Sequence, residues 1–274
     1  MQILALVPEA SCAPACLEAA AAAARSQPGA HVVALHVRVE PLKLLTSDEE
    51  VAIQRLRDAR EGTAEQRAHE TRERVQEWMR SAPPELSRLV AYDETEGGEE
   101  EQVVRASRGA EILVMARPSN LDGHDAFHAA VFLSRKSLLL VPPDWQSEAG
   151  GRLERHALIA WKQCNQAVRA VDGAMPWLRT AERVTVLTVR KEGQHVDATK
   201  LLDALSREGI HAQHISAEPI DGRTSVRILA TAEEIGASLI VMGAFRYGSL
   251  VEWALGATTQ RAISHTHVPL MLAH

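Results

Sequence analysis

Short apolar runs alternate with segments of helical spacing along the second half of the chain. The runs at 112–116 and 239–243 are apolar without alternation, as expected for strands that are buried on both faces of a sheet. Strand–helix–strand repetition predicts parallel sheets with right-handed crossovers, so we expect an α/β fold. In the second half, the predicted strands are 157–161, 184–189, 211–216, 238–243 and 268–273, and the predicted helices are 164–178, 197–208, 224–236 and 249–265.

The two halves of the chain are similar in sequence. Residues 109–115 read GAEILVM and residues 236–242 read GASLIVM, at an offset of 127. Two further matches lie at the first and at the last predicted strand of each half. Val32–Val37 matches Val184–Val189 at an offset of 152. Four matches in the same order indicate a duplication, so we expect the same fold twice. The two further matches pair Ile3–Val7 with Leu158–Trp161, and Leu138–Pro142 with Pro269–Ala273.

The fall in offset locates an insertion in the first half. About 25 extra residues must lie between the second match and the third, in the charged segment 42–82. Its apolar positions, Val51, Leu56, Val75 and Trp78, predict an extended helix with a loop, whose charged residues form a solvated face. We expect no binding role for this charge run.

The segment 144–152, which reads DWQSEAGGR, has the polar and Gly-Gly composition of an exposed connection. It divides the chain into a predicted first domain at 1–144 and a second at 153–274. A chain of 274 residues is long enough for two domains of this size.

Composition excludes several classes of protein. The chain is 46% hydrophobic and 24% charged, and its net charge of −6 gives no electrostatic reason to bind nucleic acid or an anionic membrane. No apolar run approaches the roughly 18 residues of a membrane span, and Ala19–Ala24 follows two glutamates without a basic leader. Three cysteines favour a reducing compartment. We therefore expect a cytoplasmic protein without nucleic-acid or membrane partners.

The chain resembles the universal stress protein family in its tandem form, over essentially its whole length. Residues 156–189 and 236–274 carry the resemblance, and residues 109–120 and 136–143 fit the same pattern more loosely. The resemblance implies a five-stranded parallel sheet of order 3-2-1-4-5 in each half. It thus implies two tandem doubly wound sheets of the type found in adenine-nucleotide alpha-hydrolases. Many members of this family bind ATP, and many do not.

Nucleotide-binding members of the family carry a glycine, two residues, a second glycine, nine residues, a third glycine and then serine or threonine. Gly243 fits the first place and Gly256 the third, whereas Arg246 stands at the second and Ala257 at the hydroxyl place. Glycines let backbone N–H groups approach phosphate, and the following helix adds its dipole. The second half therefore carries a degenerate phosphate motif.

The family also tends to carry an aspartate after the first strand, where this chain has Lys162, or Pro8 or Glu9 in the first half. Ala116 replaces the first glycine in the first half, so we expect no phosphate site there. ATP or ADP is the candidate cofactor, in the second half alone. The candidate cofactor-binding residues are Lys162, Gly243, Arg246, Gly256, Thr258 and Thr259.

The two departures in the glycine motif set the expected affinity. A micromolar site represents about 8 kcal/mol. Losing two charge-assisted hydrogen bonds at about 1.5 kcal/mol each leaves a dissociation constant near ~10⁻⁴ M unless cations compensate. Arg246 and Lys162 are such cations, so the side chain of Arg246 either fills the phosphate space or binds an anion there. We favour filling.

Other groupings of reactive residues have simpler interpretations. His124 and His128 in HDAFH share a helix face, but zinc peptidase motifs carry glutamate and need a third ligand. Cys12 and Cys16 have the spacing of a helix face packed on a sheet, with a redox pair as the alternative. No Gly-x-Ser-x-Gly elbow is present. We expect neither a metal site nor catalytic residues.

Two functions follow as hypotheses. The first is a stress-response protein of the universal stress type that acts by binding an unidentified protein partner and is not an enzyme. The alternative is an ATP-binding protein or slow ATPase that uses the second half. In either case we expect the last strands of the halves, Ser137–Val141 and Val268–Leu272, to pack together as an intramolecular pseudo-dimer, with a homodimer as a further possibility.

Overall fold

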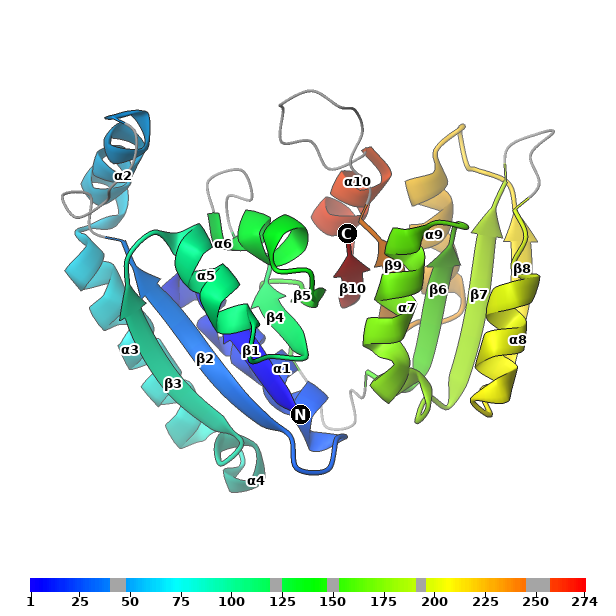
Figure 1. Cartoon of the computed structure of the whole chain (residues 1–274), viewed down its shortest axis with the longest axis horizontal. Helices are drawn as coiled ribbons and strands as arrows, with labels where there is room; N and C mark the ends of the chain where they lie inside the picture. Colours follow the sequence, from blue (N-terminus) through cyan, green and yellow to red (C-terminus); the bar gives the residue numbers. More distant parts are fainter. Residues whose placement is uncertain (40–47, 119–124, 147–152, 191–195, 245–256) are drawn as a thin grey trace. The chain divides into compact units, whose positions relative to one another are not determined.

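Strands alternate with helices along the computed structural model, which describes residues 1–39, 48–118, 125–146, 153–190, 196–244 and 257–274. Its contacts divide the chain into two units, each with helices on both faces of a sheet (Figure 1). The predicted α/β class is therefore confirmed. The first unit holds Met1–Lys136 and Pro143–Gln146, and the second holds Ser137–Pro142 and Ser147–His274.

The first unit contains four parallel strands in the order β3-β2-β1-β4, counted over its described residues. Helices α1 and α3 pack together behind this sheet, and α5 lies in front of it (Figure 1). All five residues of β4 are buried, as its unbroken apolar run predicts. The strands are β1 (Gln2–Leu6), β2 (His31–Arg38), β3 (Val90–Glu96) and β4 (Ile112–Ala116); the helices are η1 (Ala10–Cys12), α1 (Ala13–Arg25), α4 (Pro84–Ser87), α5 (Glu99–Ser107), α6 (Asp125–His128) and η4 (Ala129–Leu133).

The insertion forms two helices, α2 (Asp48–Glu61) and α3 (Ala64–Ser81), where the sequence predicted one helix with a loop. Thr63 and Gln66 form a capping box at the start of α3, which fixes the break between the two helices. The inner face of α3 is apolar and packs against α1 and β2, while its charged positions face solvent. The buried positions of α3 are Ala64, Ala68, Thr71, Val75 and Trp78.

The second unit contains five parallel strands in the order β8-β7-β6-β9-β10, which is the predicted order 3-2-1-4-5. Helices α7 and α8 cover one face, and α9 packs with α10 on the other (Figure 1). The strands are β6 (His156–Trp161), β7 (Arg183–Val189), β8 (Ala212–Ala217), β9 (Leu239–Gly243) and β10 (Leu270–Ala273); the helices are α7 (Asn165–Leu178), α8 (Thr199–Arg207), α9 (Thr224–Glu234) and α10 (Ala257–His265).

A sixth strand belongs to the second unit, counted over its described residues. Strand β5 (Ser137–Val141) pairs antiparallel with β10, with Leu139 opposite Met271. The two last strands therefore lie side by side, as the sequence predicted, but β5 is grouped with the second unit and the sheet is not wholly parallel. An uncovered β10 would present unpaired backbone groups, and β5 satisfies them.

Gly173 in α7 allows β5 to lie close beneath that helix. A Cβ atom on Gly173 would stand 2.1 Å from Ser137 Oγ and 2.5 Å from Ser137 Cβ. The same Ser137 hydroxyl donates a hydrogen bond of 3.2 Å to the carbonyl oxygen of Arg169. A glycine inside a helix is unfavourable by itself, so this close contact explains why it is tolerated.

Candidate functional site

The strand order of the second unit reverses between β6 and β9. Chain from β6 continues to β7 on one side, and chain from β9 continues to β10 on the other, so the carboxyl ends of β6 and β9 form the expected ligand crevice. Ala160 lies opposite Met242 in this pair. Counting onward from this pair, Gly243 comes opposite Trp161, and Lys162 is the next residue along. Two candidate site residues therefore lie near one another at adjacent strand ends.

Strand register fixes the corresponding residues in the first unit. Leu6 lies opposite Met115 there, as Ala160 lies opposite Met242 in the second unit. Counting onward from these pairs, Pro8 corresponds to Lys162 and Ala116 corresponds to Gly243. The sequence left Pro8 and Glu9 as alternatives, and the register selects Pro8.

The backbone of α7 approaches Gly243 closely. A Cβ atom on Gly243 would stand 2.8 Å from the amide nitrogen of Ala167 and 3.0 Å from the carbonyl carbon of Gln166. Such distances exclude a side chain at this position unless the helix moves. The first glycine of the motif thus has a packing role that does not depend on any phosphate.

Three of the remaining five candidate residues lie in the described part of the chain, and they differ in exposure. Lys162 is exposed directly after β6, Thr258 is half-buried in the first turn of α10, and Thr259 is fully buried in the same helix. A fully buried hydroxyl is not available to a ligand, so Thr258 is the accessible one of the two. Arg246 and Gly256 lie outside the residues that the structure describes.

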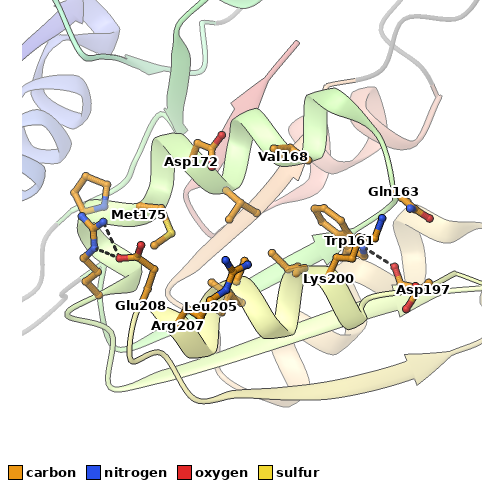
Figure 2. Close-up of a pocket in the computed structure, with 15 residues that line it drawn as sticks. Trp161, Gln163, Val168, Asp172, Met175, Asp197, Lys200, Leu205, Arg207 and Glu208 are labelled. Atoms are coloured by element: carbon orange, nitrogen blue, oxygen red, sulfur yellow. Dashed lines mark hydrogen bonds and ion pairs between the residues drawn. The ribbon is translucent and has the colours of Figure 1, made fainter.

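A cavity of about 730 Å³ lies between α7 and α8, on the face of the sheet that these helices cover. Its walls are largely apolar, and Figure 2 shows Val168 and Met175 on α7 opposite Leu205 on α8. This cavity was not among the features predicted from the sequence. Its sequence signal was the width of the apolar stripe on α7, where Val168, Val171 and Met175 extend beyond the face that contacts the sheet.

Interactions between residues close both ends of this cavity. Trp161 Nε1 donates to the Asp197 carbonyl oxygen at 3.0 Å, at the carboxyl end of β6. Arg179 donates to Glu208 Oε2 from Nε at 3.1 Å and from a terminal nitrogen at 2.9 Å, where α7 and α8 end. Figure 2 shows these two contacts at opposite ends of the row of lining residues. Trp161 is 8% exposed, so most of its surface is buried.

The cysteine pair and the histidine pair are the other candidates from the sequence. Cys12 and Cys16 are buried, and desolvation raises the pKa of both thiols, that of Cys16 to about 12. This confirms their interpretation as core residues. His128 Nδ1 contacts Glu100 Oε1, while His124 lies outside the described residues. Within the described ranges, no cluster of three or more histidine, cysteine or acidic side chains has metal-binding geometry.

No described helix has the length and apolar character needed to cross a membrane.

In structure, the chain is similar to a universal stress protein from Archaeoglobus fulgidus DSM 4304, with a TM-score of 0.65, 17% identity, and coverage of 99% of this chain and 97% of that one. It is also similar to a putative universal stress protein from Pseudomonas aeruginosa UCBPP-PA14, with a TM-score of 0.57, 14% identity, and coverage of 99% and 92%. These similarities are in fold.

A search of curated proteins finds no match to the chain. The model of the universal stress protein family matches residues 138–274, which is half of the chain. This range includes strands β6 to β10, all of β5 except its first residue, and the degenerate glycine motif. The chain therefore belongs to the universal stress protein family.

Proposed function

We propose that this member of the family acts by binding rather than by catalysis, as a stress-response protein whose second unit retains a degenerate nucleotide site. The observation that carries the proposal is the pair Lys162 and Gly243 at the carboxyl ends of β6 and β9. Lys162 stands where nucleotide-binding relatives tend to carry an acid. Gly243 is required by the packing of α7, so its presence does not argue that phosphate is still bound.

The two units differ at this site in a way that supports a single candidate position. Ala116 is fully buried at the end of β4 and carries the Cβ atom that Gly243 lacks. Pro8, which corresponds to Lys162, has no backbone N–H to donate to a phosphate. If the chain binds ATP or ADP at all, we therefore expect one site per chain, in the second unit.

Titration calorimetry with ATP tests the proposal on the full chain. We expect the wild type to bind with a dissociation constant near ~10⁻⁴ M or weaker, and Arg246→Gly to bind more tightly because it restores the second glycine. Tight wild-type binding that Arg246→Gly abolishes would mean that Arg246 holds the anion. If the Thr258 hydroxyl donates to phosphate, Thr258→Ala should weaken binding, whereas Thr259→Ser, at the fully buried position beside it, should leave binding unchanged.

A phosphate-release assay separates binding from the alternative of a slow ATPase. We expect no release above that of a Lys162→Ala variant. Sustained release by the wild type that Lys162→Ala removes would replace the binding role by an enzymatic one. We also propose a cytoplasmic location, which the free state of all three cysteines supports.

A further inference from the structure

We propose that the cavity between α7 and α8 is a second ligand site, separate from the nucleotide crevice, for a small molecule with an apolar body and one anionic group. Its volume of about 730 Å³ lies within the range of roughly 300–1,000 Å³ that is usual for sites of drug-sized ligands. The apolar wall supplies affinity for the body of such a ligand.

The closed ends of the cavity select a compact occupant. The Trp161–Asp197 hydrogen bond closes it at the carboxyl edge of the sheet, and the Arg179–Glu208 pair closes it where both helices end (Figure 2). A partner helix laid between α7 and α8 would run into both contacts. A small molecule fits between them without breaking either.

The first unit shows how a longer helix covers the corresponding face. There α3 packs against α1 over its length, and Trp78 Nε1 donates to Glu18 Oε2 at 3.1 Å. In the second unit the corresponding helix, α8, has nine residues and buries only Leu201 and Leu205. Val168 on α7 is left 44% exposed beside the cavity. The short α8 therefore leaves apolar surface that a ligand would bury.

One cation of the cavity lining, Lys200, can bind an anionic group. Glu208 is neutralised by Arg179, and the Asp197 carboxylate accepts a hydrogen bond from the backbone of Thr199 at the start of α8. The other charged residues of the lining are Asp172 on α7 and Lys200 and Arg207 on α8. In the described part of the chain, the Lys200 ammonium has no hydrogen-bond or ion-pair partner.

Lys200 is the better anion-binding residue of the two cations. Arg207 already donates from Nε to the carbonyl oxygen of Asp203 at 3.3 Å, and it lies at the end closed by the Arg179–Glu208 pair. Lys200 lies at the other end, in the first turn of α8, where the helix dipole also favours an anion. We therefore place the anionic group beside Lys200 and the apolar body toward Met175 and Leu205.

Two fluorescent probes of nearly the same shape test both parts of this proposal on the full chain. These are 8-anilinonaphthalene-1-sulfonate, which is anionic, and N-phenyl-1-naphthylamine, which lacks the sulfonate. We expect each to bind once per chain. Lys200→Glu should weaken binding of the sulfonate probe about fivefold and leave binding of the neutral probe unchanged. Arg155→Glu, at an exposed position of the same unit, controls for net charge.

Two substitutions test the position of the apolar body. Ala204→Phe fills the cavity from α8, and Val168→Asp places a charge on its exposed wall; both should abolish binding of both probes. Leu133→Asp is the matched control for Val168→Asp, because Leu133 is 42% exposed and lies in the first unit. The methyl resonance of Met175 should shift when either probe is added to the wild type.

Several results would overturn the proposal. Probe binding that survives both Val168→Asp and Ala204→Phe would place the probes elsewhere. Equal loss of both probes in Lys200→Glu would remove the anionic group from the proposal. Displacement of the probes by ATP would merge the cavity with the nucleotide crevice. A dimer that dissociates in Val168→Asp, with no probe bound to the wild type, would assign this face to a second copy of the chain.

Discussion

The amide nitrogen of Ala167 lies 2.8 Å from the point where a side chain on Gly243 would begin. The first turn of α7 and the last residue of β9 are thus in direct backbone contact at the strand-order reversal. This contact separates two roles that a glycine in a phosphate motif can have. One role is to let phosphate approach, and the other is to let a helix approach.

Substitution of Gly243 by alanine tests the packing role. We expect Gly243→Ala to lower the free energy of unfolding by about 1–3 kcal/mol, because the added methyl group must displace α7 or the end of β9. Urea denaturation measures this, and the loss should be the same with and without ATP. Gly98→Ala is the control, since a Cβ atom on Gly98 meets nothing within 4 Å. A neutral Gly243→Ala would show that α7 moves aside freely.

Gly173 and Ser137 offer a second packing test. Gly173→Ala should destabilise the fold by about 1–3 kcal/mol, because its methyl group would meet both the hydroxyl and the Cβ atom of Ser137. Ser137→Gly should recover most of the loss when combined with Gly173→Ala. Ser137→Ala should recover less, since it keeps the Cβ atom that stands 2.5 Å away. Thermal unfolding of Gly173→Ala, of the two Ser137 variants and of the two double variants measures the coupling.

Equal effects of Ser137→Gly and Ser137→Ala in the Gly173→Ala background would contradict this close contact. The result would mean that β5 shifts away from α7 as a whole. The pairing of Leu139 with Met271 provides an independent check, because hydrogen exchange of the β5 amides should then rise in Gly173→Ala.

Periodicity in the sequence was sufficient to predict the strands of the second unit, whereas their order was predicted from the resemblance to the universal stress protein family. Apolar runs such as that of β9 are unambiguous because both faces of the strand are buried. The match between the last strands of the halves predicted that β5 and β10 lie side by side. It did not predict that they pair antiparallel, because periodicity carries no information on strand direction. The break between α2 and α3 depends on the Thr63 capping box, a local feature that the apolar pattern does not contain.

The candidate site was harder to predict than the fold. Gly243 matches a phosphate motif in sequence, but the reason for a glycine there is the distance to α7, which is a tertiary quantity. The cavity between α7 and α8 depends on the length of α8 and on the Arg179–Glu208 contact. Neither feature is encoded in a short run of residues.

Thiol reactivity should follow burial. Cys164 is partly exposed just before α7, whereas Cys12 and Cys16 are buried with raised pKa values. Because the thiolate is the reactive form, we expect Cys164 to react first with Ellman's reagent and the other two to react at least about tenfold more slowly. All three should react at once in urea. A fast phase that remains in Cys164→Ser would contradict the burial of Cys12 and Cys16.

Two buried histidines should make the stability of the protein depend on pH. His156 is 5% exposed; its Nδ1–H donates to the Ile235 carbonyl oxygen at 3.0 Å, and Nε2 accepts from the Thr185 hydroxyl at 2.9 Å. His36 is 3% exposed and donates from Nδ1 to Val7. Burial disfavours the charged imidazolium, so it lowers the pKa of both histidines in the folded protein.

The direction of the pH effect follows from these lowered pKa values. The unfolded chain binds protons first as the pH falls below about 6.5, so the stability that is present above this pH declines toward the folded pKa values. Urea denaturation between pH 7.5 and 5.5 should show the decline, and His36→Gln and His156→Gln should each make it shallower, with the double variant flattest. His31→Gln, at an exposed position in β2, should follow the wild-type curve. Stability that rises on acidification would mean that the folded state binds protons more readily than the unfolded chain, and a double variant as steep as the wild type would assign the decline to other groups.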